Sequence, residues 1–494
     1  MPFVWNLPYL CVFLTMIAAI LLSVLRGARR AYVLTVAVSA LCCALSLVFL
    51  RFILRADAAY AFTMGKFPAP FGNEIKLGPL QALLTACFSA VLCLSLLGGR
   101  RELFEDVEEK KMGLACVMFC MVLASLFVLC YTNDAFTAYV FLEISTIAAC
   151  ALVMIRDTGP TLAATLRYLF LSLLGSGLFL LGVILLYAVT GHLLMPQLSA
   201  AVGKLTAAGE GRAALALSLA AMTAGLGVKA AMFPFHRWLP DAHGSATTAS
   251  SAVLSGLVVK GYAVLLILFY VRVFTLETVR SFGVHNAVFA LGCAGMLLGS
   301  LRALKETHAK RMLAWSSVAQ LGYVFMGIGL GTEAGVAAAV FQMLAHAFTK
   351  PLLFICVGRL ASVRGHDKQL AALRGSAWQE PLAGLGFGVG ALSMVGIPLF
   401  GGFAAKVYFS TASIFGDEKV LLTLAVLALS SVLNALYYLP ALINLWSDPK
   451  PDAPRAEKDP AATAAILALA AGVLLLGLCY APVMEIITRG IALL

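Results

Sequence analysis

Long apolar runs alternate with short polar connections along almost the whole of this 494-residue chain. A membrane-spanning helix needs about 20 mainly apolar residues. We predict fourteen such helices, at 4–25, 31–51, 78–98, 112–131, 135–155, 164–189, 212–235, 248–271, 284–303, 312–330, 334–358, 381–413, 418–446 and 461–486. The longest connections are 52–77, 190–211, 359–380 and 447–460. The pattern predicts an all-α polytopic membrane protein.

Composition agrees with this pattern and argues against a soluble domain, a nucleic-acid surface and a metal site. Hydrophobic residues make up 62% of the chain and charged residues 12%, whereas soluble domains carry about 25% charged residues. The net charge of +11 comes from basic residues in short connections, so it does not indicate a nucleic-acid surface. The 12 cysteines include no CxxC pair and lie mostly in apolar runs, which predicts neither disulfides nor a metal site.

The distribution of Lys and Arg predicts the orientation of the chain. The odd-numbered connections carry 21 of these residues and the even-numbered side carries 10. Basic connections favour the cytoplasm, so we expect a multi-pass protein of the cell membrane with both termini outside. The first apolar run lacks a basic leader and is expected to be retained as a span.

A few ionisable residues fall inside the predicted spans, where a charge costs at least about 2.5–3.5 kcal/mol. These residues are Glu143, Lys229, Lys260, His346, Lys350 and Lys406. Structural explanations remain open for three of them. Lys350 could extend to the headgroups, Glu143 could be a hydrogen-bond partner, and His346 could be a packing residue.

Two of these lysines stand beside residues that break helices. Gly225, Gly227 and Pro234 surround Lys229, and Pro398, Gly401 and Gly402 precede Lys406. Such breaks free backbone groups to line a polar cavity. Burial disfavours a charged lysine and a nearby carboxylate favours it, so a mobile partner could switch the proton on and off. The set predicts a proton relay.

Spacing suggests an internal duplication. We predict N-terminal helices at 1–111, one five-helix unit at 112–272, a second at 284–446 and a last helix at 461–494. Lys229 and Lys406 fall in the fourth helix of their units. Because five is odd, the two units would be inverted repeats. Glu143 would correspond to Trp315 or Ser316, so the second unit has no matching acid.

Four segments carry a family resemblance over nearly the whole chain: FLEISTIAACALV, FPFHRWLPDAHGSATTASSAVLSGLVVKGY, FQMLAHAFTKPLLF and GIPLFGGFAAKVYF. They resemble the antiporter-like subunits of respiratory complex I, membrane-bound hydrogenases and Mrp-type Na⁺/H⁺ antiporters. Their sequences are most similar to the Mrp D-type subunit. The early segment MGKFPAPFGNEIKLGPL is similar to that family's first external segment.

The resemblance implies fourteen helices with two inverted five-helix repeats, and a role for each relay residue. Glu143 and Lys229 would form a charge pair, Lys260 the central relay, His346 a connecting group and Lys406 the terminal relay, with Lys350 and His236 as accessory residues. The chain departs from the family in three ways. Thr247 and Ala249 replace the usual prolines, Gly78 stands where many relatives have Asp, and we do not expect the long lateral helix of the L-type subunit after Leu494.

We therefore expect a subunit that translocates protons, or Na⁺ and H⁺, within a larger complex of integral membrane subunits in the lipid bilayer. A self-contained transporter of an organic solute is the alternative. A redox subunit is not expected, since haem b needs paired intramembrane histidines and nucleotide-binding glycine motifs are absent. We predict no cofactor and no metal. A lysine-lined path suits protons better than Na⁺, whose site we would place on a neighbouring subunit.

Overall fold

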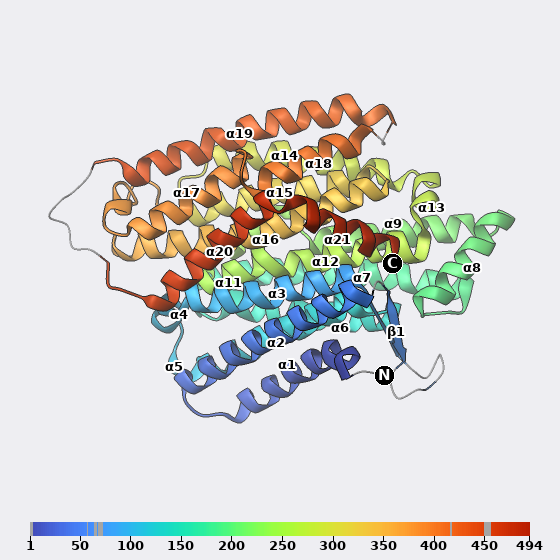
Figure 1. The fold of residues 1–494 in the computed structure, drawn as a ribbon, viewed down its shortest axis with the longest axis horizontal. Helices are drawn as coiled ribbons and strands as arrows, with labels where there is room; N and C mark the ends of the chain where they lie inside the picture. The colour runs from blue at the N-terminus through green and yellow to red at the C-terminus, as the bar shows by residue number, and fades with distance from the viewer. Residues whose placement is uncertain (1–2, 57, 64–66, 68–72, 415–416, 449–455) are drawn as a thin grey trace.

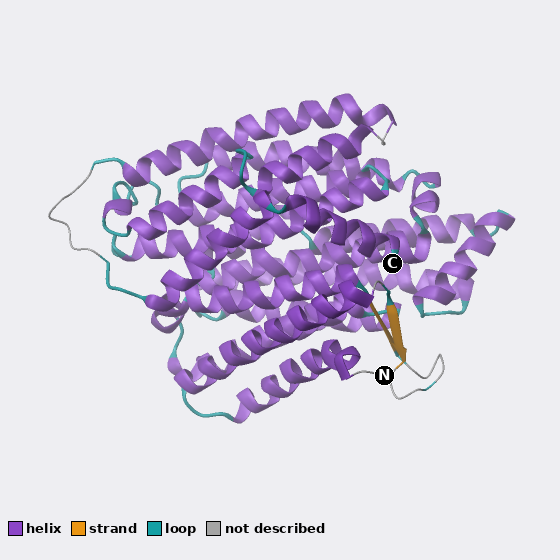
Figure 2. Cartoon of the chain, viewed as in Figure 1, coloured by secondary structure: helices purple, strands orange, loops and turns teal. Residues whose placement is uncertain are grey.

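The computed structural model describes residues 3–56, 58–63, 67, 73–414, 417–448 and 456–494. Residues 64–66 and 68–72 of MGKFPAPFGNEIKLGPL lie outside these ranges, as do Lys450 and Arg455; Lys66, Lys450 and Arg455 contribute to the predicted orientation. Within the described part the chain is almost wholly helical, with one small hairpin (Figure 2). This confirms the all-α polytopic fold.

The N-terminal part forms one edge of the bundle (Figure 1). Its elements are η1 (Phe3–Asn6), α1 (Leu7–Val24), α2 (Ala28–Ala56), β1 (Tyr60–Thr63), β2 (Glu74–Leu77), α3 (Pro79–Gly98) and α4 (Arg100–Asp106). The strands pair antiparallel, with Tyr60 opposite Leu77. This hairpin lies in the connection 52–77, where only a loop is expected from the hydropathy pattern.

The first predicted five-helix unit contains a broken helix. Its elements are α5 (Glu109–Tyr131), α6 (Ala135–Met154), α7 (Gly159–Thr190), α8 (Met195–Ala208), α9 (Arg212–Lys229), η3 (Phe235–Arg237), α10 (Trp238–Ser245), α11 (Thr248–Val253), η4 (Leu254–Val258), α12 (Val259–Leu268) and η5 (Phe269–Phe274). The predicted helix 212–235 ends early, at Lys229, where Ala231 adopts a φ of 55°. The short helix α8 is an addition within the connection 190–211.

The remaining elements complete the second unit and the C-terminal part. They are α13 (Leu276–Ser281), α14 (Val284–Leu304), α15 (Ala309–Gly329), α16 (Glu333–Ser362), η6 (Ser376–Trp378), α17 (Pro381–Val395), α18 (Gly401–Ile414), η7 (Asp417–Lys419), α19 (Val420–Trp446), α20 (Pro460–Leu478) and α21 (Tyr480–Ala492). The predicted helix 381–413 is divided into α17 and α18, and the predicted last helix into α20 and α21.

Twelve helices of the described chain are long and apolar enough to cross a membrane. The two other predicted spans are the ones divided at Lys229 and before Lys406, so the fourth helix of each predicted unit is broken. The N- and C-termini lie at the same end of the bundle, and α4 and the start of α20 lie at the opposite end (Figure 1). An even number of crossings produces this arrangement.

The centre of the bundle is formed by three segments, two of which carry three of the six intramembrane ionisable residues. The apolar windows of Thr248–Phe274, Ala309–Gly329 and Glu333–Ser362 are 100%, 94% and 94% buried, whereas that of α2 is 28% buried. Protein therefore shields Lys260, His346 and Lys350 from lipid. At the start of the first segment, the Thr247 hydroxyl accepts a hydrogen bond of 3.1 Å from the Ser250 amide. This N-cap stabilises the turn at which α11 begins.

Candidate functional site: a chain of buried lysines

The first group joins the intramembrane carboxylate to a lysine. Lys229 is the last residue of α9 and is fully buried. Its Nζ lies 3.9 Å from Glu143 Oε1 on α6. The ammonium donates a hydrogen bond to the Thr146 hydroxyl and lies 5.6 Å from the centre of the Tyr262 ring. The structure thus brings the predicted pair together.

Close backbone packing sets the position of Lys229. A Cβ added to Gly225 on α9 would lie 2.5 Å from the carbonyl oxygen of Gly175 on α7. No side chain fits at that distance, so only glycine permits this approach. The two helices therefore meet at their backbones just before α9 ends, which fixes the depth at which the Lys229 ammonium emerges.

Glu143 is only partly buried within the isolated chain, contrary to the expectation of a deeply buried acid. Its side chain is 21% exposed, and its Oε1 is buried without a hydrogen-bond partner among the described residues. Sequence position fixes how far along a span a residue lies but not which way it points around the helix. Here α6 directs the carboxylate towards the edge of the subunit as well as towards Lys229.

Lys260 lies in the centre of the bundle and is fully buried. The π-helical turn η4 immediately precedes its helix, and the Lys260 ammonium donates a hydrogen bond to the Ser255 carbonyl in that turn. A π-helical turn shifts the regular pairing and is common at functional sites. The Ser255 hydroxyl in turn lies 2.9 Å from the Ser317 hydroxyl on α15, which links the two predicted units.

His346 and Lys350 lie one turn apart on α16, and both are buried. Lys350 Nζ donates to the Leu313 carbonyl at 2.8 Å and to the Tyr438 hydroxyl at 3.1 Å. Extension of Lys350 to the headgroups is therefore wrong. His346 Nε2 has no hydrogen-bond partner among the described residues, although the ring lies within electrostatic range of Lys260 and Lys350.

Lys406 lies beyond the break between α17 and α18. Gly396 ends α17 with a φ of 90°, and a Cβ there would lie 2.5 Å from Lys406 Nζ. The ammonium donates to the Val395 carbonyl, which the break has freed, and to the Ser431 hydroxyl at 2.7 Å. Within the described ranges no carboxylate lies at ion-pair distance from Lys406. It differs in this respect from Lys229.

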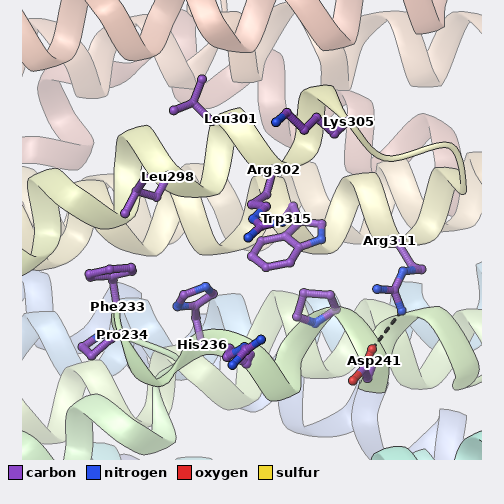
Figure 3. Close-up of a pocket in the computed structure, with 12 residues that line it drawn as sticks. Phe233, Pro234, His236, Asp241, Leu298, Leu301, Arg302, Lys305, Arg311 and Trp315 are labelled. Atoms are coloured by element: carbon purple, nitrogen blue, oxygen red, sulfur yellow. Dashed lines mark hydrogen bonds and ion pairs between the residues drawn. The ribbon is translucent and has the colours of Figure 1, made fainter.

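His236 stands apart from the other predicted residues. It lies in η3, with its ring centre 5.4 Å from those of Phe233 and Trp315 (Figure 3). Its neighbours among the described residues are aromatic rings and arginines, and they include neither the buried lysines nor Glu143. The structure thus places His236 at the mouth of a cavity near the odd-numbered connections and does not bring it into the central group.

Sequence reasoning missed a second buried polar group. Lys310 is counted in a connection, yet it is fully buried at the start of α15 and donates to the Ala246 carbonyl. His243 is also fully buried, and it lies within electrostatic range of Lys310, Lys350 and Lys260. The sequence offers one indication of this burial, which is that His243 lies between a broken helix and a central span. Neither ring nitrogen of His243 has a hydrogen-bond partner among the described residues, so only charge proximity relates it to these lysines.

An ion pair between Glu102 and Lys368 lies at the end of the bundle where Lys310 is buried. Glu102 on α4 accepts hydrogen bonds from the Lys368 ammonium and the Thr248 hydroxyl. Burial alone would raise the pKa of Glu102, but the positive charges of Lys368 and Lys310 outweigh it and lower the pKa to about 2. Glu102 is therefore ionised at neutral pH and compensates two neighbouring ammonium groups.

The ionisable side chains of this arrangement can bind protons. Among the described residues no group of three or more His, Cys, Asp or Glu side chains is placed to hold a metal ion. All twelve cysteines are free thiols. The chemistry available is that of lysines whose neighbours are carbonyls, hydroxyls and one carboxylate.

Comparisons with known proteins agree with this geometry. Residues 132–433 match the family described as NADH:quinone oxidoreductase/Mrp antiporter, transmembrane. NADH-quinone oxidoreductase subunit N of Desulforudis audaxviator is 32% identical over 466 residues, covering 92% of this chain and 89% of the relative.

Two solved structures share the fold. A chain of the archaeal membrane-bound sulfane sulfur reductase superposes with a TM-score of 0.87 at 25% identity, covering 99% of this chain and 97% of that one. A chain of the Mrp complex from Dietzia sp. superposes with a TM-score of 0.85 at 24% identity, covering 100% and 97%. On the sequence match and the shared fold, the chain belongs to the NADH:quinone oxidoreductase/Mrp antiporter transmembrane family.

Proposed function

We propose that this chain is the proton-translocating, antiporter-like subunit of a multisubunit membrane complex. The observation that carries the proposal is a series of lysines inside the bundle at helix breaks and at a π-helical turn. Lys229 and Lys260 are fully buried and Lys406 is partly buried. One carboxylate and one histidine supplement these lysines. The relay residues are Glu143, Lys229, Lys260, His346 and Lys406, with Lys350 and His236 as accessory residues.

The Glu143–Lys229 pair is the switch of the relay. While the carboxylate lies near Lys229, the buried ammonium is compensated and keeps its proton. If the carboxylate moves away, burial disfavours the ammonium and the proton leaves towards the centre. The partial exposure of Glu143 supports this role, because a carboxylate at the subunit's edge can respond to a neighbouring subunit.

The central residues pass the proton by mutual repulsion. Lys260, His346 and Lys350 lie within electrostatic range of one another, with no carboxylate of the described chain among them. A proton on one group therefore disfavours a proton on the next. Lys406 receives the proton last and releases it through the break between α17 and α18.

The lysine-rich lining favours protons over Na⁺. Hard cations are bound by several oxygen ligands, and ammonium groups repel them. If Na⁺ is exchanged, its site belongs to a neighbouring subunit. The relatives support a subunit role, since the matched chains come from a quinone oxidoreductase, a respiratory sulfur reductase complex and an Mrp complex. A self-contained transporter of an organic solute is not favoured.

The excess of basic residues in the odd-numbered connections supports placement of both termini outside the cell membrane. The two termini lie together at the less basic end of the bundle (Figure 1).

Replacement of Lys260 by Met tests the relay. The variant keeps the length of the side chain but cannot carry a proton, so we expect the complex to assemble and pH-gradient formation in vesicles to be lost. The matched control is Lys204→Met, which removes an exposed lysine on α8. Near-normal pumping by Lys260→Met, at equal complex abundance, would remove the central step from the proposal.

A further inference from the structure

A cavity of about 810 Å³ opens between the segment that follows α9 and the adjoining ends of α14 and α15 (Figure 3). Phe233, His236 and Asp241 line one wall. Arg302 and Trp315 lie on the facing wall. The cavity is outside the chain of buried lysines and has no part in the proposed relay beyond containing His236.

The charges of the cavity are unbalanced. Arg311 Nη1 lies 2.8 Å from Asp241 Oδ1, and Arg167 lies 2.6 Å from the other oxygen of the same carboxylate. Asp241 is thus already shared by two arginines. The other cations of the lining are Arg237, Arg302 and Lys305, whose side chains make no ion pair or hydrogen bond with another described residue.

A buried polar atom without a partner points to a missing acceptor or donor in the same place. His236 is only 8% exposed, and its Nδ1 makes no hydrogen bond within the described chain. The ring extends into the cavity beside Trp315 (Figure 3), and it lies within electrostatic range of Arg237 and Arg302. Native proteins rarely leave such atoms unsatisfied. A ligand with oxygen acceptors would satisfy the imidazole and the guanidinium groups together.

The cavity is continuous with an apolar face. Leu298 and Leu301 line it from α14 and are 43% and 44% exposed. Arg302 follows on the last turn of the same helix. A cationic hollow thus adjoins the exposed apolar side of a membrane-spanning helix. Basic pockets between transmembrane helices near the membrane surface are suited to lipid headgroups.

We propose that this cavity binds an anionic phospholipid. The phosphate contacts Arg237, Arg302 and Lys305, His236 contributes a hydrogen bond, and an acyl chain follows Leu298 and Leu301. An aqueous phosphate ion would leave the two leucines uncovered. Arginine guanidinium groups suit the geometry of phosphate oxygens. A lipid bound there would contact α14 and α15 of the second predicted unit and the segment that follows α9 in the first.

Photo-labelling of the purified complex tests this proposal. The complex is placed in phosphatidylcholine nanodiscs that contain a minor fraction of phosphatidylglycerol with a photoreactive acyl chain, and labelled peptides are mapped. We expect labelling around Leu298 and Leu301. The double variant Arg302→Gln/Lys305→Gln should need about 30-fold more phosphatidylglycerol for equal labelling, which corresponds to about 1 kcal/mol for each cation removed.

The control is Arg374→Gln/Lys458→Gln, which removes two cations from exposed positions in other odd-numbered connections and should label as the unmodified complex does. Three outcomes would overturn the proposal: equal labelling of these peptides by photoreactive phosphatidylcholine, displacement of the lipid by inorganic phosphate alone, or no labelling because an acidic segment of another subunit fills the cavity. Both substituted residues of the test variant are exposed, and intact assembly of that complex is checked by its elution volume.

Discussion

The paired switch predicts that Glu143 and Lys229 act as one unit. The perturbations are Glu143→Gln, Lys229→Ala and the double variant. At the observed separation of 3.9 Å between Nζ and Oε1, two unit charges attract by about 4 kcal/mol when the effective dielectric constant is about 20. Removal of one member of a buried pair typically costs about 3–5 kcal/mol. Because Glu143 is partly exposed, we expect a cost of about 3 kcal/mol, at the lower end of this range.

A cost of about 3 kcal/mol in the charged intermediate corresponds to a loss of about 100-fold in rate. Each single variant should therefore form a pH gradient about 100-fold more slowly in vesicles. The double variant should be little worse, because the first substitution has already removed the interaction. Thr146→Val is the matched control. It removes the hydroxyl that accepts from the Lys229 ammonium and donates to the Leu142 carbonyl, and it leaves both charges in place. A hydrogen bond to a charged group is worth about 1.5–3 kcal/mol, and we expect the lower end of that range, which corresponds to a loss of about 10-fold.

Losses that multiply would refute this reasoning. If the two residues act separately, the double variant should be about 10,000-fold slower by the same conversion. The paired-switch mechanism would then have to be abandoned, even if each residue alone proved important. Complex abundance must be equal in the unmodified complex and in all four variants, so that a lost subunit is not mistaken for a lost step.

Two further outcomes are expected. The isolated chain in liposomes should show no appreciable cation/H⁺ exchange, because its Glu143 switch lies at the subunit's edge and needs a neighbouring subunit. Robust exchange by the purified chain would contradict the requirement for partners. Glu102→Gln should lower the melting temperature of the detergent-solubilised complex at neutral pH. The depressed pKa of Glu102 represents stability that is present above pH about 4.5 and lost as the pH falls towards about 2. The melting temperatures of variant and unmodified complex should therefore converge over that acidic range, and a constant difference down to pH about 2 would show that Lys368 and Lys310 do not stabilise the Glu102 carboxylate.

The spans and the interruptions beside Lys229 and Lys406 could be predicted because they depend on local sequence, whereas the division of the last predicted helix into α20 and α21 was not predicted. Apolar length defines a span, and glycine or proline beside Lys229 and Lys406 marks a break. Burial of Lys310 and His243 could not be predicted in this way. Each lies next to a polar connection, and only the folding of that connection over the helix ends removes it from water. Similarly, hydropathy gives the depth of Glu143, whereas its orientation depends on which helices pack around α6.

Small elements in the connections were missed for a related reason. Helix α8 and the hairpin of β1 and β2 are too short and too polar to stand out from a loop in a hydropathy profile. They are stabilised by contacts with distant segments, such as the antiparallel bridge between Ile75 and Thr132. A pattern read along the chain contains no record of such contacts.

The most direct test of the central claim is proton pumping by complexes that carry substitutions of Lys406, the terminal lysine of the relay. Its ammonium is held by the Val395 carbonyl and the Ser431 hydroxyl, with no carboxylate of the described chain at ion-pair distance. Lys406→Ala should assemble and lose most pH-gradient formation in vesicles. Lys406→Arg should restore little, because a guanidinium keeps its proton. Near-normal pumping by the Ala variant, at equal complex abundance, would place proton transfer outside this chain of lysines.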